Sequence, residues 1–404
     1  MRIIYLHQYF VTPDMAGGTR SFEIARRLVN AGHEVHVVTT WSKPTEKRGW
    51  YETDESGIRV HWLPVPYSNA MSYRDRIMAF MRFAFSSANK AAFLNGDVIF
   101  ASSTPLTIAL PGIYASLWKR IPMVFEVRDL WPELPIVIGA LRNPVSKGLA
   151  RFLEWLAYHC SAHVVALSPG MAEGVMRRGI PASRITVIPN SCDIGLFNVP
   201  ATYGDAFRSK YEWLGERPLV VYAGTMGFIN GVEYFVKLAK RVSEFDPDIR
   251  FLVVGKGKEE RKVKETAESL GVLNINFFML PQIPKREMPY VLSAADVTTS
   301  FVINLKELWP NSANKFFDSL AAGKPIAINH EGWQADIIRR TGAGLVLDPV
   351  DIDTSAELLF QAIKNRDGLE KAGLAARKLA REEFSRDELA KRLENVLQIV
   401  VSGR

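Results

Sequence analysis

The chain has 404 residues, a net charge of +7 and a composition typical of globular proteins, with 48% hydrophobic and 23% charged residues. Its length is enough for about two domains with large cores, and its two cysteines, Cys160 and Cys192, exclude a scaffold built on many disulfides. The basic charge is compatible with nucleic acid, an anionic membrane surface or a phosphorylated substrate as a partner.

The first predicted elements form a strand–glycine loop–helix–strand unit. An apolar strand at residues 3–6 is followed by Gly17-Gly18 and then by a helix over about 19–31, where apolar residues recur at helical spacing. The next strand covers residues 35–39. This order is typical of a Rossmann-like domain.

The same unit returns in the second half. A strand at 219–222 leads to Gly224, Gly227 and Gly231, and a helix then precedes a strand at 251–254. Further apolar strands are expected at 98–100, 123–127, 163–167 and 185–188 in the first half, and at 275–278, 297–300, 326–328 and 344–347 in the second. We therefore predict an α/β protein with two Rossmann-like domains, each on a parallel sheet.

The domain boundary is expected between residues 190 and 216, where prolines and glycines interrupt any regular pattern. We predict an N-terminal domain over 1–195 and a C-terminal domain over 196–385. Residues 386–404 are predicted to form a last helix, which could cross back to the N-terminal domain.

The segment 310–325 predicts a helix that begins near Asn314 and ends at Gly323, followed by a strand. Lys315 and Asp318 are three residues apart, so they share one helix face. Amides at a helix start, with a lysine beside them, suit a phosphate, and Asp318 can accept hydrogen bonds from sugar hydroxyls. Phosphate and hydroxyls together indicate a nucleotide sugar.

Two glycine loops could hold the same ligand. Gly17-Gly18 and Gly224-Thr225 allow the backbone to approach a diphosphate closely, although each could also be an ordinary tight turn. Lys256, between two glycines, either approaches the nucleotide or is a solvated loop lysine. Arg20 either pairs with the phosphates or lies solvated on its helix.

Arg128 and Asp129 follow the strand at 123–127, at a carboxyl end where open sheets bind ligands. We interpret Asp129, with Arg128 and Glu133, as the catalytic candidates, because a carboxylate here could orient an acceptor hydroxyl or the donor sugar. The alternatives are a surface salt bridge for Arg128-Asp129 and a helix-start residue for Glu133.

The segment 73–94 is the candidate for membrane contact, since basic residues alternate with aromatic ones and no acid occurs from residue 76 to 96. Arg76, Phe80, Arg82 and Phe83 would touch the acceptor or the lipid headgroups. The alternative, a core helix whose aromatics face the sheet, is left open. No apolar run is long enough to span a bilayer, so we expect a cytoplasmic protein, free or peripheral on the inner membrane.

No metal site or cofactor is expected. His159, Cys160 and His163 lie where a helix passes into a strand, which separates them. The two Asp-x-Asp pairs, at 246–248 and 351–353, fit a turn and a helix start.

Several motifs in order give the chain a resemblance to the family 4 glycosyltransferases, which have the two-domain GT-B fold with a cleft between the domains. The motifs lie at 16–20, 167–171, 187–193, 252–257, 314–325, 342–346, 348–349 and 383–385. The run 128–133 and the opening residues 5–10 resemble bacterial O-antigen and capsule enzymes of the N-acetyl-L-fucosaminyltransferase type.

The resemblance implies transfer of a sugar, with retention of configuration, from a nucleotide-diphosphate donor to a lipid-linked saccharide. The donor would be UDP-N-acetyl-L-fucosamine or a related UDP-sugar, held by the C-terminal domain, and the acceptor would be held by the N-terminal domain. No cofactor is implied, since the nucleotide sugar is a substrate. Lys315, Lys256 and backbone amides would stabilise the leaving diphosphate, with Asp318 on the ribose.

The sequence departs from the family pattern at the phosphate site. The family usually has a Glu at the position of Asp318 and another eight residues earlier, where this chain has Pro310. A basic pair usually stands where Thr225 and Asn230 are found. The usual clamp on the diphosphate is therefore incomplete.

Three other functions fit parts of the sequence. A sugar-nucleotide 2-epimerase would keep the fold and act without an acceptor. A non-enzymatic sugar-nucleotide-binding protein would fit the missing clamp residues. A nucleic-acid-binding protein is suggested by charge alone, and we expect no nucleic-acid partner because no recognisable motif or basic stripe with stacking aromatics is present.

Overall fold

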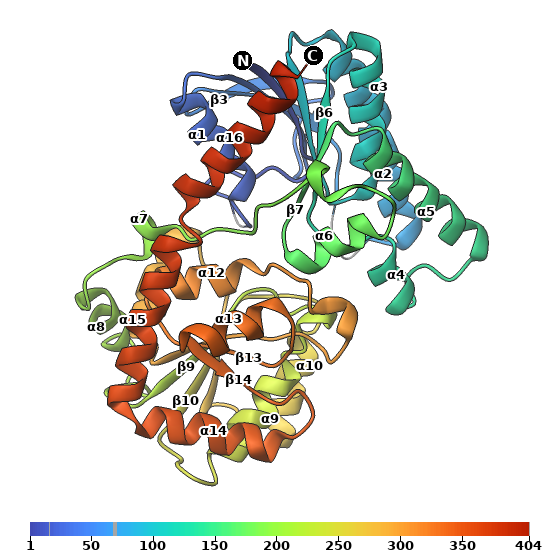
Figure 1. Cartoon of the computed structure of the whole chain (residues 1–404). Helices are drawn as coiled ribbons and strands as arrows, with labels where there is room; N and C mark the ends of the chain where they lie inside the picture. Colours follow the sequence, from blue (N-terminus) through green and yellow to red (C-terminus); the bar gives the residue numbers. More distant parts are fainter. Residues whose placement is uncertain (16, 68–70, 404) are drawn as a thin grey trace.

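The computed structural model describes residues 1–15, 17–67 and 71–403, and it consists of two α/β lobes joined at one side (Figure 1). The first sheet has the strand order β3-β4-β2-β1-β5-β6-β7-β8, and the second has the order β11-β10-β9-β12-β13-β14. The strands of the first sheet are β1 (Arg2–Leu6), β2 (Glu34–Trp41), β3 (Tyr51–Glu55), β4 (Ile58–Pro64), β5 (Val98–Ser102), β6 (Met123–Val127), β7 (His163–Ala166) and β8 (Ile185–Val187). Those of the second are β9 (Leu219–Ala223), β10 (Arg250–Val254), β11 (Phe277–Leu280), β12 (Val297–Ser300), β13 (Ile326–Ile328) and β14 (Gly344–Val346).

Helices cover both faces of each sheet (Figure 1). In the first lobe they are α1 (Arg20–Asn30), α2 (Tyr73–Phe93), α3 (Ala109–Lys119), α4 (Glu133–Val137), α5 (Pro144–His159) and α6 (Pro169–Met176). The link and second lobe hold α7 (Ile194–Phe197), α8 (Thr202–Arg208), α9 (Glu233–Val242), α10 (Glu260–Ser269), α11 (Met288–Ala294), α12 (Asn314–Ala321), α13 (Trp333–Thr341), α14 (Ile352–Lys364) and α15 (Arg366–Glu382). Both faces of the central strands are buried, and most of their residues are apolar, as in β1, where Ile3 to Leu6 are fully buried.

The first sheet departs from the all-parallel prediction at one edge. β3 pairs antiparallel with β4 through a tight turn at Ser56 and Gly57, both with positive φ. The hairpin was missed because β3 is polar and half-exposed. In the second lobe β11 (Phe277–Leu280) begins and ends two residues later than the strand predicted at 275–278.

The last helix, α16 (Arg386–Ser402), leaves the second lobe and packs on the first. Its apolar stripe, with Leu389, Leu393 and Leu397, lies in the same hydrophobic core as β1 and α1. In Figure 1 it runs in red along the first lobe, and the two chain ends lie close together. The chain therefore crosses between the lobes twice, and the crossings touch where the Cys192 amide donates to Phe384 O (2.8 Å).

None of the described helices combines the length and apolar character needed to cross a membrane.

Candidate active site between the two lobes

The loops after the strands of both sheets meet across the space between the lobes. Parallel strands end at one edge of a sheet, so the loop after β1 and the start of α12 each lie at a carboxyl edge. A Cβ atom on Gly18 would lie 2.7 Å from Asn314 Nδ2, and one on Gly170 would lie 3.1 Å from Pro310. The Asn190 amide donates to Ser312 Oγ (3.0 Å). The Gly17-Gly18 loop and the start of α12 therefore meet at the boundary between the lobes, where the predicted GT-B fold has its cleft.

The start of α12 is an open anion-binding end. Its N-cap is Ala313, which has no side-chain oxygen to accept a bond from the first amides. Those amides carry the positive end of the helix dipole, at the end of α12 where the Asn314 side chain approaches Gly18 of the other lobe.

Lys315, on the first turn of α12, lies under the Gly224 loop. Its Nζ donates to Tyr222 Oη (2.9 Å) and lies 4.6 Å from the centre of the Tyr222 ring. With the Asn230 amide turned so that its nitrogen donates to Thr225 O, the Asn230 oxygen also accepts from Nζ (3.2 Å). Burial lowers the pKa of Lys315 to about 8. In the described part of the chain, no carboxylate forms an ion pair with this ammonium.

The loops at Gly224 and Gly255 of the second lobe pack closely against each other. A Cβ on Gly255 would lie 2.0 Å from Gly224 O, and one on Gly257 would lie 2.1 Å from Met226 O. Only glycine fits either position, which gives these residues a packing role. Thr225 and Lys256 remain exposed at the loop tips.

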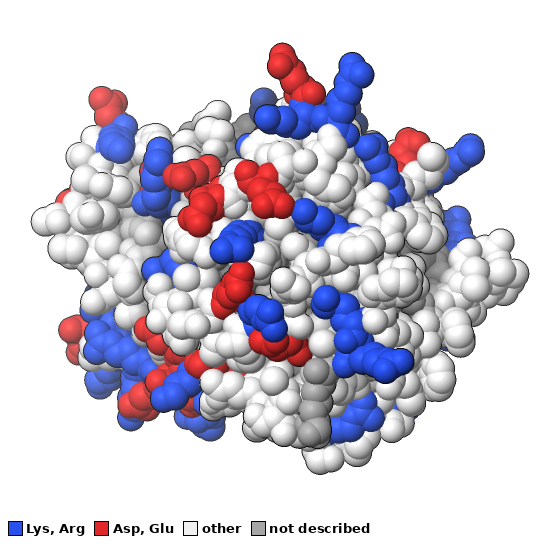
Figure 2. Space-filling model, turned by 90° about the horizontal axis from the view of Figure 1, so that it is seen from above, with Lys and Arg blue, Asp and Glu red and all other residues white. Residues whose placement is uncertain are grey.

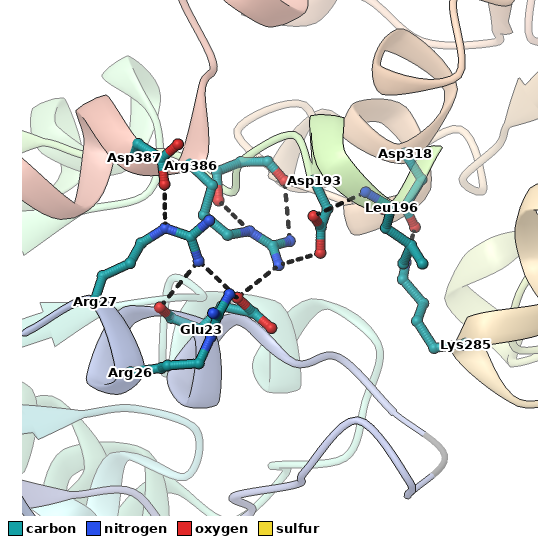
Figure 3. A network of polar contacts seen from close by, with 10 residues as sticks. Glu23, Arg26, Arg27, Asp193, Leu196, Lys285, Asp318, Arg386 and Asp387 are labelled. Carbon is teal, nitrogen blue, oxygen red and sulfur yellow. Dashed lines mark hydrogen bonds and ion pairs between the residues drawn. The ribbon is translucent and has the colours of Figure 1, made fainter. Parts of the chain in front are cut away.

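Asp318 lies one turn along α12 from Lys315 and forms an ion pair with Lys285, whose Nζ is 4.8 Å from the centre of the Phe197 ring. Asp318 does not pair with Lys315, although the two residues are three apart on the same helix. In Figure 3, Asp318 and Lys285 lie beside a network that joins the lobes. There Arg386 donates to Asp193 (2.9 Å) and lies 3.9 Å from Glu23 of α1. Asp318, the predicted ligand of the ribose, thus lies next to both segments that cross between the lobes.

Arg128 and Asp129 lie on the first-lobe side of the cleft. Thr104 donates to Asp129 (2.9 Å), and desolvation raises the pKa of this carboxyl above its ordinary value, against the Thr104 bond and the Arg128 charge, which lower it. An Arg128 N–H donates to His7 Nε2 (3.3 Å). Burial and the Arg128 charge lower the pKa of His7 to about 3, so His7 is a neutral acceptor that orients Arg128.

The assignment of Arg20 to the phosphates is wrong. Its side chain is 3% exposed and forms an ion pair with Glu126 (2.8 Å), while its other N–H groups donate to Pro189 O and Ile188 O. Burial works to raise the pKa of Glu126, but Arg20 and Arg128 outweigh it and keep the pKa below its ordinary value. Arg20 ties α1 to β6 and to the exit from the first sheet.

Two further assignments need correction. Glu133 begins α4 and forms an ion pair with Arg178, which also binds the buried Glu154, so the structure favours the helix-start interpretation over a catalytic one. Phe83 is 1% exposed and belongs to the core under α2.

Phe80 stacks on Tyr67 at 5.7 Å, and Arg76 lies over the same ring, whereas Arg82 is exposed. Of the predicted membrane face of α2, Phe83 is thus buried and Phe80 half-buried, whereas Ile77, Met78, Phe85 and Phe93 remain exposed, so membrane contact by this helix stays a prediction.

Sequence reasoning missed His7, Lys285 and Arg386. His7 carries the same signal as Arg128-Asp129, a polar residue directly after a buried strand. Lys285 comes from a loop between prolines, and Arg386 from the start of the crossing helix. No spacing could have brought either to the site.

Within the described ranges, no group of three or more His, Cys, Asp or Glu residues is arranged to hold a metal ion. The expectation of a reaction without metal or cofactor stays a prediction.

Comparison with known families agrees with this geometry. Residues 16–191 match the family model of the glycosyl transferase 4-like domain, and residues 205–379 match that of the glycosyl transferases group 1. The chain belongs with the GT-B glycosyltransferases. The division at 195/196 predicted from the sequence falls between the two matched regions.

The individual relatives have low sequence identity, but their alignments cover most of this chain. WcaI of Escherichia coli, provisionally named a colanic acid biosynthesis glycosyl transferase, is 24% identical over 289 residues, which are 67% of this chain and 69% of that protein. A GDP-mannose-dependent alpha-(1-6)-phosphatidylinositol monomannoside mannosyltransferase of Mycobacterium tuberculosis is 23% identical over 308 residues, 74% of this chain and 75% of that one. The crystal structure of Anabaena HepE with UDP-glucose has a TM-score of 0.74 at 15% identity, covers 98% of this chain and 99% of its own, and shows the shared fold.

Proposed function

We propose that this glycosyltransferase moves a sugar from a UDP-linked donor to a lipid-linked saccharide during bacterial surface polysaccharide assembly. The observation that carries the proposal is the ammonium of Lys315. It lies at the uncapped start of α12, opposite the Gly17-Gly18 loop, and pairs with no carboxylate among the described residues. A buried cation beside free amides is stabilised by a ligand with more than one negative charge, such as a diphosphate.

The donor is proposed to lie along the second lobe. The diphosphate would contact the α12 amides, Lys315 and the two glycine loops, with Lys256 reaching from its exposed loop. Asp318 would exchange its bond with Lys285 for the ribose hydroxyls. UDP as the nucleotide is supported by the complex of the structural neighbour HepE with UDP-glucose. N-acetyl-L-fucosamine as the sugar rests on the resemblance of the opening residues 5–10.

The acceptor is proposed to approach from the first lobe. Asp129 would accept a hydrogen bond from its hydroxyl, and Arg128, held by His7, would fix its orientation. Charge that develops on the departing diphosphate is stabilised by Lys315 and the amides, which need no movement to do so. Retention of configuration is proposed from the family resemblance, and no covalent nucleophile is assigned. A lipid-linked acceptor is supported by the mycobacterial relative, whose name specifies a phosphatidylinositol mannoside.

A thermal-shift screen of UDP-, GDP-, ADP- and dTDP-sugars tests the donor, because a ligand that binds the folded state raises its apparent stability. We expect UDP-sugars to give the largest shift, and a larger shift with GDP-mannose would make the UDP assignment wrong. Turnover of the donor without an acceptor would indicate the epimerase, and binding without turnover in a membrane extract would indicate a sensor.

Asp318→Ala tests the site itself. We expect it to abolish transfer at donor concentrations below saturation, since the ribose loses its acceptor. Full activity under those conditions would contradict the assignment.

A further inference from the structure

An outer surface of the first lobe exposes large apolar side chains on two neighbouring helices. On α3 these are Tyr114, Leu117 and Trp118, and on α5 they are Val145, Leu149, Phe152 and Trp155. Leu117 is 72% exposed and Val145 is 68% exposed, values that a core-facing stripe never has. We call these seven residues the α3–α5 surface.

Their spacing places each set on one helix face that looks away from the sheet. Positions 114, 117 and 118 follow the i, i+3, i+4 pattern, and positions 145, 149 and 152 follow i, i+4, i+7. α3 contacts α5, so the two faces adjoin. Tyr114 stacks on Trp118, and Phe152 stacks on Trp155, which orders the aromatic rings. Isolated exposed apolar residues are ordinary, but an ordered set on adjacent helices indicates a binding surface.

The charged side chains that these two helices and their flanking residues expose have one sign. The sequence from 109 to 122 contains Lys119 and Arg120 and no acid. From 138 to 159 it contains Arg142, Lys147 and Arg151, and its one acid, Glu154, is 1% exposed and bound to Arg178. In Figure 2 the right-hand side, where α5 reaches furthest in Figure 1, is largely white with scattered blue and little red. The partner must therefore accept apolar side chains and carry negative charge.

We propose that the α3–α5 surface docks on an anionic lipid bilayer. Aromatic rings and aliphatic side chains would enter the headgroup boundary, while the long lysine and arginine side chains reach the phosphates. A second copy of the chain is a poor occupant, because a two-fold interface would set these positive charges against each other.

The surface is continuous with the catalytic side of the cleft. α5 follows α4, whose end exposes Val137 and Ile138, and α4 follows Asp129 directly in the chain. α4 also contacts residues Lys306–Leu308 of the second lobe. An acceptor anchored in the bilayer would thus reach the cleft from the α4 side. This use of the surface rests on the proposed function, whereas docking itself does not.

Vesicle flotation tests the docking with the full chain. We expect the protein to float with vesicles that contain phosphatidylglycerol and to bind phosphatidylcholine vesicles at least about tenfold less, with binding that falls as salt rises. Leu117→Ser/Phe152→Ser and Lys147→Glu/Arg151→Glu should each lower binding by about tenfold or more. Leu374→Ser/Ile399→Ser is the matched control, since these side chains are 61% and 70% exposed elsewhere and should not matter.

The unfolding temperature of every variant shows whether a loss of flotation comes from a folding defect. UDP binding by every variant shows whether the proposed function fails independently of docking. Three results would overturn the proposal: no flotation of the wild-type chain, equal loss in the control, or conversion of a dimer to a monomer by the surface substitutions without an effect on flotation.

Discussion

The two lobes differ in how the charged side chains near their boundary are paired. In the first lobe Arg20 forms an ion pair with Glu126 and Arg128 donates to His7, so both cations have partners within the fold. In the second lobe Lys315 has only neutral partners among the described residues, and the amides at the start of α12 lack a side-chain cap.

This difference separates groups that stabilise the fold from groups that await a ligand. A buried charge that is paired lowers the free energy of the folded chain only as long as its partner remains. A buried charge with neutral partners lowers the stability of the free protein and regains that free energy when an anion binds. Substitution of Arg20 should therefore change stability, and substitution of Lys315 should change affinity.

The largest effect is expected for Arg20→Met. It leaves Glu126, which is fully buried, without its cation, and breaking a buried pair costs about 3–5 kcal/mol. Urea unfolding should show this loss, while the molecules that remain folded bind UDP normally. Arg20→Met/Glu126→Gln should recover part of the stability. Weak UDP binding by a stable Arg20→Met variant would instead indicate that Arg20 binds the phosphates.

A second, smaller effect is expected for Lys315→Met, this time on the donor. Loss of a charge-assisted bond to phosphate costs about 1.5–3 kcal/mol, which is about 10- to 100-fold in the Kd for UDP measured by calorimetry. Stability should stay the same or rise, because an ammonium whose pKa is lowered by burial destabilises the free fold below that pKa.

Lys324→Met is the matched control for this change. Lys324 is also half-buried, and burial lowers its pKa as well, but it lies beyond the other end of α12 in a cavity with Asp296 and Arg377. UDP affinity should be unchanged in this variant. An equal loss in both variants would mean that net charge, and not the position of Lys315, controls binding.

The fold was largely predictable because its signals are local. Runs such as Ile3-Ile4-Tyr5-Leu6 are apolar on both faces, and the glycine loops that follow recur in both halves. The β3–β4 hairpin escaped because a polar, half-exposed edge strand has no such run, although Ser56-Gly57 carried a turn signal.

The candidate site was predictable only in its second-lobe part. Lys315 and Asp318 follow from one helix and its spacing, and in the structure Lys315 lies under the Gly224 loop and Asp318 pairs with Lys285. Arg20 was misassigned because a helix-start arginine beside glycines looks the same whether it faces the cleft or a buried glutamate 106 positions away. Phe83 was misassigned because the sequence does not reveal which face of α2 the sheet covers.

A third effect concerns pH and sharpens the role of Lys315. With a pKa of about 8 in the free protein, Lys315 is charged below that pH and neutral above it. Diphosphate binding favours the charged form, so UDP affinity should be constant from about pH 7, where the terminal phosphate of UDP is already ionised, to about pH 8, and fall by up to about tenfold per pH unit above it. Lys315→Arg keeps its charge throughout this range and should flatten the profile, even if its affinity is lower. A wild-type profile that stays flat to about pH 9.5 would contradict the lowered pKa.

The smallest effect is expected where the lobes approach each other. A Cβ on Gly18 would lie 2.7 Å from Asn314 Nδ2, and Asn314 is an exposed side chain that can move aside. Gly18→Ala should therefore weaken UDP binding only a few-fold, by about 0.5–1 kcal/mol, and Asn314→Ala should weaken it by no more. The double variant should lose less than the sum of the two, because the methyl group no longer displaces the amide. Calorimetric Kd values for UDP, measured on the wild type, the two single variants and the double variant, give the coupling free energy between Gly18 and Asn314. Strict additivity would mean that the two loops do not meet in solution, which would contradict a diphosphate held between them.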